Sequence, residues 1–390
     1  MKAKRVVVGI SGGVDSGVAA YMLKKQGYDV VGLFMRNWHD TTGLKSASCT
    51  YEDDVMFAEM VAKKLSIPFY EVDLSEPYRR RVIDYLFKEY ESGRTPNPDV
   101  LCNREIKFDA FAEEAFKLDA DFVATGHYCR KETIKTPHGD MHRLLAGKDP
   151  NKDQSYFLCQ VNQKQLSTAL FPIGELMKPQ VREIAREQNL ANADRKDSQG
   201  ICFVGKVDLP TFLQQQLQVK KGDIVEIPAN SKLVVDSDDL TRLAAPYPFT
   251  PESGIMIGQH RGAHFFTVGQ RKGINIGGKP KPLFVIGTDV AKNILYVGQG
   301  QDHPLLSKKA LFIRNEDMHW IRPDLTISSG EEREYKIRIR YRQELQNGSL
   351  IMRPEGGYVL FDTPQRAVVS GQFTAFYLKD ELVASGVIQH

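Results

Sequence analysis

The first 130 residues alternate between the patterns of short buried strands and of amphipathic helices, and this alternation restricts the possible folds most. Residues 5–10 form a β-branched run typical of a strand that is buried on both faces. Residues 16–25 have apolar side chains at helical spacing, and Gly27 follows where a helix commonly ends. Further strands are expected at 29–35, 68–74 and 121–125, and further helices at 52–65, 77–91 and 105–118. The pattern predicts an α/β domain with a Rossmann-like, doubly wound parallel sheet.

Beyond about residue 206 the chain changes to short, closely spaced strands separated by Gly, Pro and Asp. The strands are expected at 222–227, 263–268, 283–288, 294–297, 335–341, 349–353, 358–361, 373–378 and 386–388. This pattern predicts a small β-rich middle domain and a C-terminal β-barrel. Because a length of 390 residues favours two or three domains, we place them at 1–206, 207–282 and 283–390.

A glycine-rich segment with the sequence Ser11-Gly12-Gly13-Val14-Asp15-Ser16 lies directly between the first expected strand and the first expected helix. Glycines at this position let backbone N–H groups close around phosphate oxygens, and the helix N-terminus adds positive potential. No lysine follows the loop, so it is not a Walker A motif. Residues 273–279 do match G-x-x-x-x-G-K, but Pro280 follows and has no hydroxyl group for magnesium. We therefore predict phosphate binding at 11–16 only.

The composition excludes several classes of protein. Lys and Arg exceed Asp and Glu by 52 to 49, and 42% of the residues are hydrophobic, which is neither a disordered nor a fibrous composition. No run of eighteen apolar residues exists, so no membrane helix and no membrane partner are expected. The apolar run at 6–8 is too short for a signal peptide. We expect a cytoplasmic protein.

Five cysteines are spread along the chain, at Cys49, Cys102, Cys129, Cys159 and Cys202. No two of them have C-x-x-C spacing, which argues against a zinc ribbon, a thioredoxin-type motif or an iron–sulfur cluster. A functional cysteine would thus act as a single thiol or meet its partner through the fold. Cys102 is expected just before a helix, where the helix N-terminus can lower a thiol pKa.

In this setting the loop at 11–16 resembles the PP-loop of ATP pyrophosphatases, which adenylate a substrate oxygen and release pyrophosphate. Further strings occur at MRNW 35–38, GRTPNPD 93–99, CN 102–103, TGHY 125–128, KDQS 152–155, SQGICF 198–203, FTVGQRKG 266–273, RYR 340–342 and GQF 371–373. Together they resemble the family of tRNA-specific 2-thiouridylases, which thiolate the wobble uridine of the anticodon. The resemblance extends over nearly the whole chain.

The resemblance implies that ATP is a co-substrate and that magnesium assists its reaction. It implies no structural metal and no iron–sulfur cluster. It implies that ATP is bound by Gly9, Ile10, Ser11, Gly12, Gly13, Val14, Asp15, Ser16, Met35 and Gly126. It implies that the tRNA is bound by Asn97, Pro98, Asp99, His127, Lys152, Asp153, Gln154, Arg340, Tyr341 and Gln372. Asn97 and Asp99 also fit an Asx turn and a helix cap, and His127 fits a strand-end histidine.

The cysteines also fit this chemistry. The oxygen on uridine C2 is a poor leaving group, so adenylation must precede its replacement, and thiolates are natural sulfur carriers. By resemblance, Cys202 carries a persulfide from a donor protein such as a cysteine desulfurase or a relay protein, and Asp99 assists proton transfer. Cys102 is then the partner thiol. It attacks the activated base, or it releases sulfide by forming a disulfide with Cys202, and the sequence is consistent with both routes.

A basic pattern lies near the C-terminus, where Lys336, Arg338, Arg340 and Arg342 recur at period two and share one face of an expected strand. Such a face can follow a phosphate backbone. In isolation a solvated strand face is the favoured interpretation, and the family resemblance raises the RNA-binding one. Flipping out a single-stranded wobble base also costs less free energy than flipping out a paired base.

The sequence departs from the family pattern at about 228–253, which is an insertion in the middle domain, and at Ser370, where the family usually has proline. Two other functions fit parts of the chain. An amide-forming PP-loop ligase, or another adenylating enzyme that modifies tRNA, would use the same phosphate loop. A tRNA-binding protein without catalysis would retain the basic face but would not need Asp99, Cys102 and Cys202.

Overall fold

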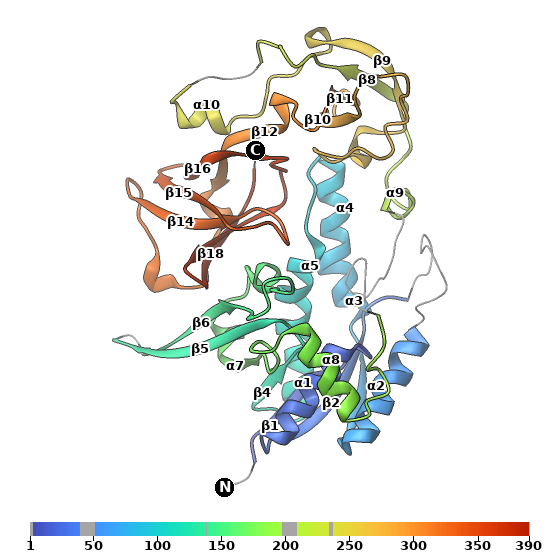
Figure 1. The fold of residues 1–390 in the computed structure, drawn as a ribbon, viewed down its shortest axis with the longest axis vertical. Coiled ribbons are helices and arrows are strands. Elements are labelled where there is room, and N and C mark those ends of the chain that lie inside the picture. The colour runs from blue at the N-terminus through green and yellow to red at the C-terminus, as the bar shows by residue number, and fades with distance from the viewer. Residues whose placement is uncertain (1–2, 40–50, 138, 197–208, 234–236, 390) are drawn as a thin grey trace.

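The computed structural model describes residues 3–39, 51–137, 139–196, 209–233 and 237–389. Figure 1 shows an α/β part with the N-terminus at one end of the long axis and two β-rich parts at the other end. Cys49 and Cys202 lie outside the described residues.

The α/β part is built on a parallel sheet of five strands, in the order β3-β2-β1-β4-β7. These strands are β1 (Arg5–Gly9), β2 (Asp29–Arg36), β3 (Phe69–Asp73), β4 (Phe122–Ala124) and β7 (Ala169–Leu170). The middle of β1 is fully buried, as its β-branched sequence predicted. The expected parallel sheet is thus confirmed. From β1 the chain continues to β2 and β3 on one side, and then returns to β4 and β7 on the other side of β1. The switch point therefore lies between β1 and β4, and ligands of such sheets bind at the switch point.

Helices pack around this sheet and lead away from it. They include α1 (Val14–Lys25), α2 (Tyr51–Leu65), α7 (Gln163–Thr168) and α8 (Lys178–Glu187). A continuous helical segment comprises α3 (Ser75–Tyr78), a π-helical stretch (Arg79–Ile83) and α4 (Asp84–Glu91). A second comprises α5 (Pro98–Leu101), a π-helical stretch (Cys102–Ala110) and α6 (Phe111–Lys117).

The second of these helices begins earlier than the sequence predicted. Asn97 adopts an extended conformation, and its side chain accepts a hydrogen bond from the N–H of Val100 at 3.3 Å, so the helix starts at Pro98 instead of near residue 105. An N-cap residue followed by proline is a standard helix start. The prediction that Cys102 precedes the helix was therefore wrong, since Cys102 lies within it.

The middle part contains a sheet of four strands in the order β10-β11-β8-β9. They are β8 (Gly222–Glu226), β9 (Ile255–His260), β10 (Leu283–Asp289) and β11 (Ile294–Gln299), with short helices α9 (Leu209–Leu213) and α10 (Leu240–Ala244) nearby. We had placed 283–288 and 294–297 in the last domain, but β10 and β11 form a hairpin whose second strand pairs with β8. The expected strand at 263–268 is wrong, because Ala263–Phe265 forms a 3-10 turn after Gly262, whose φ is +142°.

The C-terminal part is a sheet of nine strands. Seven come from the end of the chain, namely β12 (Ser307–Arg314), β13 (Met318–Trp320), β14 (Glu332–Arg338), β15 (Gln346–Arg353), β16 (Gly356–Arg366), β17 (Phe373–Leu378) and β18 (Glu381–Val387). The other two are a hairpin of the α/β part, β5 (Cys129–Thr136) and β6 (Gly139–Ala146), which pairs with β18 through β6. The sequence did not predict this pairing.

A network of buried charges reinforces the contact between β6 and β18. The Glu381 carboxylate accepts hydrogen bonds from Arg322 and, at 2.7 Å, from Arg143 on β6. Arg322 and Glu381 are almost fully buried. One hydrophobic core also runs through the junction and includes Phe111, Tyr156 and Phe373.

We expect Glu381→Ala to lower the free energy of unfolding by about 3 kcal/mol, because it leaves buried arginine charge without its partner. Glu132 pairs with the same Arg143 but is half exposed, so Glu132→Ala is expected to cost about 0–1 kcal/mol. Urea denaturation of both variants measures the difference. Equal effects would contradict the importance of this network.

Candidate active site at the carboxyl edge of the parallel sheet

The predicted phosphate loop is a tight turn between β1 and α1. Gly12 has a φ of +74°, and a Cβ atom there would lie 2.4 Å from the carbonyl oxygen of Asp54. The Ser16 hydroxyl accepts a hydrogen bond from the Ser11 N–H at 3.1 Å and donates to the Gly13 carbonyl at 3.0 Å. The turn is therefore fixed from within. The first N–H groups of α1 have no acceptor inside the helix, which suits this turn to an anion.

The other predicted nucleotide-binding residues lie around the same turn. Gly126 follows β4, and a Cβ atom there would lie 2.7 Å from the backbone of Asp15 and Ser16. At Gly9, a Cβ atom would lie 3.4 Å from the Phe111 ring and 3.6 Å from the methyl group of Met35. The structure therefore brings Gly9, Met35 and Gly126 close to the switch point, where the two glycines allow the backbone and its neighbours to pack tightly.

A lysine from a distant segment supplies the cation that the loop sequence lacks. Lys178, the first residue of α8, donates hydrogen bonds to both carboxylate oxygens of Asp15, at 2.8 and 2.9 Å. The Tyr128 hydroxyl donates to the same carboxylate at 2.7 Å. Lys178 was not predicted, and Tyr128 was named only as part of the TGHY string, because nothing in their local sequence indicates contact with a loop over a hundred residues away.

Two further side chains hold the outer side of the loop. The Asn192 amide donates to the carbonyls of Gly12 and Gly13, at 3.1 and 2.9 Å. Arg195 donates to the Gly12 carbonyl at 3.2 Å and pairs with Asp54 at 2.9 Å. Burial raises the pKa of Asp54, and the charge of Arg195 opposes this rise. Both residues were missed by sequence analysis.

A second cluster surrounds Cys102. Asn97 caps the helix that carries Cys102, and Asp99 lies in its first turn. Cys102 is fully buried, and the next residue, Asn103, donates hydrogen bonds to the carbonyls of Asp99 and Phe157 at 3.0 and 3.2 Å. Cys102 thus lies in the second turn of this helix, five residues after its N-cap Asn97.

The same helix joins this cluster to the phosphate loop. Phe111, nine residues after Cys102, packs at Gly9. At the rise of a helix, nine residues span roughly 10–14 Å. The helix therefore fixes the separation between the Cys102 cluster and the end of β1 that precedes the phosphate loop.

His127 is buried at the end of β4. One ring nitrogen lies 2.7 Å from the Thr125 hydroxyl, and the other lies 3.5 Å from the Lys107 ammonium. Burial and the charge of Lys107 hold the His127 pKa well below its ordinary value of 6.5. The imidazole is therefore neutral at pH 7.

Two of the expected tRNA-binding residues at 152–154, Asp153 and Gln154, form hydrogen bonds or ion pairs with other residues of the protein. Asp153 accepts hydrogen bonds from the N–H groups of Gly147 and Ser155, and pairs with Arg338 at 2.9 Å. Gln154 accepts a hydrogen bond from the Tyr128 N–H at 3.0 Å. Lys152 is half-buried beside them.

The expected basic face at 336–342 is interrupted. Arg338 pairs with the buried Asp153, and β14 ends there, so the prediction of four basic residues on one strand face was wrong. The exposed Arg340 donates a hydrogen bond to the Arg366 carbonyl at 2.9 Å. The Tyr341 ring packs 4.3 Å from that of Phe157. Strand periodicity cannot show that a charged side chain has a buried partner.

Two further cysteines, Cys129 and Cys159, are buried as well. Burial raises the pKa of Cys159 to about 12 and raises that of Cys129 well above its ordinary value. Both thiols are therefore protonated and weak nucleophiles at neutral pH.

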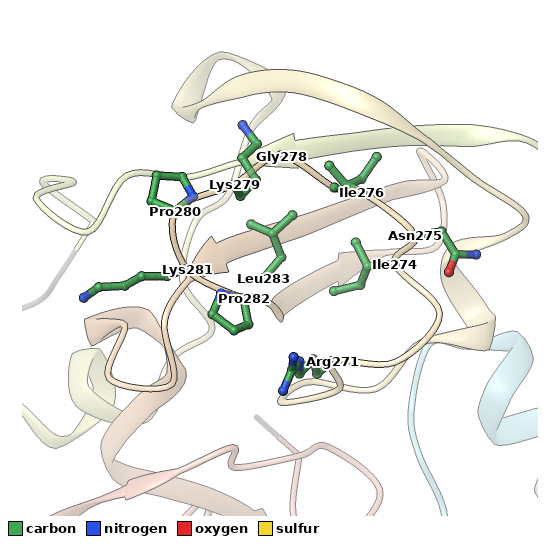
Figure 2. A pocket seen from close by; sticks show the side chains of 11 residues that line it. Arg271, Ile274, Asn275, Ile276, Gly278, Lys279, Pro280, Lys281, Pro282 and Leu283 are labelled. Atoms are coloured by element: carbon green, nitrogen blue, oxygen red, sulfur yellow. The ribbon is translucent and has the colours of Figure 1, made fainter.

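A pocket of about 400 Å³ lies in the middle part, as Figure 2 shows. It is lined by residues from 271 to 283 and includes the G-x-x-x-x-G-K string that the sequence analysis set aside. Lys279, the lysine of that string, forms an ion pair with Glu226 at 2.5 Å. The pocket therefore lacks the free lysine and the helix N-terminus of a Walker A loop.

Metal-ligating groups do not cluster in the described part of the chain, where no three His, Cys, Asp or Glu side chains form a potential site. Within the same ranges, no helix is both long and apolar enough to cross a membrane.

Known proteins match this chain along its whole length. The family described as "tRNA methyl transferase HUP domain" matches residues 4–206, the "tRNA methyl transferase PRC-barrel domain" matches 248–299, and the "Aminomethyltransferase beta-barrel domain" matches 311–388. The last match agrees with the predicted C-terminal β-barrel.

Curated relatives are similar over nearly full length. Proteins from Christiangramia forsetii and Flavobacterium johnsoniae are each 56% identical to this chain, over 99% of it and 100% of their own length. A Bacillus subtilis protein is 44% identical, over 98% of this chain and 94% of its own. All three are named tRNA-specific 2-thiouridylase.

We expect Gly126→Ala to weaken ATP binding about tenfold or more, because the added methyl group collides with the backbone at the start of α1. Titration calorimetry with ATP measures the effect. Gly277→Ala is the matched control, since a Cβ atom there meets nothing within 4 Å. An unchanged affinity in the Gly126 variant would contradict the assignment of this edge as the nucleotide site.

His127 is expected to make stability depend on pH. The folded state holds it neutral, whereas the unfolded chain takes up a proton near pH 6.5, so its contribution is present above that pH and is lost as the pH falls. The loss is at most about 1.4 kcal/mol per pH unit. We expect His127→Gln to show a shallower fall in the free energy of unfolding between pH 7 and 5.5, measured by urea denaturation. An identical slope in both proteins would refute this.

Proposed function

The chain belongs to the family of tRNA-specific 2-thiouridylases, and we propose that it is an ATP-dependent tRNA sulfurtransferase that acts on the wobble uridine of the anticodon. The observation that supports this most is the pair of clusters joined by one helix. The phosphate loop lies beside Phe111, and Cys102 lies nine residues earlier on the same helix.

The first step is adenylation of the uridine. The O2 atom attacks the α-phosphorus of ATP, pyrophosphate leaves, and O2 becomes part of a good leaving group. The phosphates would lie on the loop residues 9–16, between Met35 and Gly126. Lys178 holds the Asp15 carboxylate in place, which keeps the start of α1 in its anion-binding shape. Magnesium would be carried by the ATP phosphates, as is usual for this ion.

The second step replaces oxygen by sulfur. A persulfide on Cys202, delivered by a sulfur-donor protein, supplies the sulfur, and AMP leaves from C2. Cys102 is the partner thiol, and Asp99 assists proton transfer. In one route the outer sulfur of the persulfide attacks C2 and displaces AMP; the Cys102 thiolate then attacks the Cys202 sulfur, so that the S–S bond to the base breaks and a Cys102–Cys202 disulfide forms. In the other route the Cys102 thiolate attacks the Cys202 sulfur of the persulfide first, which forms the same disulfide and releases sulfide, and the sulfide attacks C2 and displaces AMP.

The tRNA would lie over the first turn of the Cys102 helix, at Asn97, Pro98 and Asp99, and over the C-terminal sheet at Arg340 and Tyr341. His127 and the 152–154 turn form the wall behind the base. Because Asp153 and Gln154 are engaged by the protein, their part is to shape this wall. We propose that the reaction takes place in the cytoplasm.

The test is thiouridine formation in unmodified tRNA with ATP, magnesium and a persulfide donor. We expect Cys102→Ala and Cys202→Ala each to lose at least 10³-fold in rate, since each removes a reacting sulfur atom. Cys159→Ala is the matched control, because the pKa of its buried thiol is raised and it should keep most of the activity.

Two outcomes would contradict the proposal. Pyrophosphate release without sulfur incorporation would indicate an adenylating ligase with an ammonia or amine acceptor. Binding of tRNA without any formation of AMP would indicate a binding protein that lacks catalysis.

A further inference from the structure

All three parts of the chain meet at residues 94–97, just before the helix that carries Cys102. From the middle part, the Thr267 hydroxyl lies 2.9 Å from that of Thr95. From the C-terminal part, the Ser370 carbonyl accepts a hydrogen bond from the Thr95 N–H at 2.9 Å. Gly371 lies so close that a Cβ atom there would be 3.0 Å from the Thr95 carbonyl oxygen.

Gln372 contacts this segment through both the nitrogen and the oxygen of its side-chain amide. Its amide nitrogen donates to the carbonyls of Thr95 and Pro96, at 2.8 and 3.2 Å. Its amide oxygen lies 3.4 Å from the side-chain nitrogen of Asn97, at the long limit of a hydrogen bond. Both ends of the Gln372 side chain are therefore engaged by three consecutive residues of another part of the molecule.

The backbone of Gln372 is itself fixed. Its carbonyl accepts a hydrogen bond from the Ile388 N–H at 2.8 Å, and the Gly371 N–H donates to the Ile388 carbonyl at 2.8 Å. The side chain thus reaches out from the start of β17, an inner strand of the C-terminal sheet that pairs with β14 and β18.

The segment that Gln372 holds sets the position of Cys102. Asn97 is the N-cap of the helix, and Cys102 follows five residues later. Because a cap fixes where a helix begins and in which direction it runs, a shift at Asn97 moves the first two turns. Displacements of about 1 Å at a reacting group can reduce rates about 100-fold.

We propose that Gln372 is a positioning residue for the Cys102 thiol, and acts through Thr95, Pro96 and Asn97. Through this contact, the position of the Cys102 thiol depends on how the C-terminal sheet packs against residues 95–97. The catalytic part of this inference rests on the role of Cys102 in the proposed function. It differs from the role that the family resemblance implies, which is direct contact with tRNA.

The test measures three quantities in Gln372→Ala and in Gln372→Glu, which keeps the shape but cannot donate to two carbonyls. They are the rate of thiolation with saturating tRNA, the Kd for tRNA, and the rate of alkylation of Cys102 by iodoacetamide, followed by peptide mass spectrometry. We expect thiolation at saturating tRNA to fall about 10- to 100-fold and alkylation of Cys102 to rise on the order of tenfold. The Kd for tRNA should rise by less than the thiolation rate falls, because residues 97–99 are only some of the proposed tRNA contacts.

Gln163→Ala is the matched control. Gln163 also joins two parts of the chain, since its amide donates to the carbonyls of His142 and Ile321 at 2.8 and 2.6 Å. It makes no contact with residues 94–97, so its loss should leave Cys102 alkylation unchanged. Circular dichroism shows whether each variant is folded. If Gln372→Ala is unfolded, the three measurements on Gln372→Glu decide the test.

Unchanged Cys102 alkylation in a folded Gln372 variant would overturn the proposal. A weaker Kd with unchanged alkylation would make Gln372 an RNA contact instead. Alkylation does not require catalysis, so it separates this inference from the proposed function. If Cys102→Ala keeps full activity, the proposed role of Cys102 fails, while the alkylation rates still decide whether Gln372 fixes the helix.

Discussion

The phosphate loop depends on the left-handed turn at Gly12, and that turn depends on segments far away in sequence. Its carbonyl is held by Asn192 and Arg195, and its α carbon faces the backbone of α2 at Asp54. A glycine is needed because any side chain would collide there. Two distant segments, residues 192–195 and α2, thus fix one short turn. The anion site is therefore preorganised, so little conformational entropy remains to be lost when a phosphate binds.

The catalytic part and the C-terminal sheet share both backbone pairing and a core. The β5–β6 hairpin begins directly after Tyr128 in the α/β part, and its strand β6 pairs with β18 of the C-terminal sheet. Arg143 and Arg322 converge on one glutamate at this seam, and the hydrophobic core continues across it. The α/β part and the C-terminal sheet are therefore joined by strand pairing, buried ion pairs and shared apolar packing at one seam.

The sequence predicted the features that local patterns determine. The β-branched run at 5–10 and the glycines at 12 and 13 were enough to locate β1, the phosphate loop and the parallel sheet. Prediction from the sequence failed where the role of a side chain depends on a partner that is distant in sequence. Lys178 looks like any lysine at a helix start, and Arg338 looks like one of a row of exposed cations until the buried Asp153 is found beside it. The early start of the Cys102 helix was missed because Asn97-Pro98 fits a turn as well as a cap.

The pairing of β6 with β18 has a consequence for how this chain can be divided. A fragment that ends near residue 206 would contain the whole parallel sheet, but it would also expose the edge of β6 that β18 normally covers. Exposed strand edges recruit other strands and promote aggregation. The catalytic part is therefore not a separable module, and an evolutionary exchange of the C-terminal sheet would have to preserve the register of this one seam.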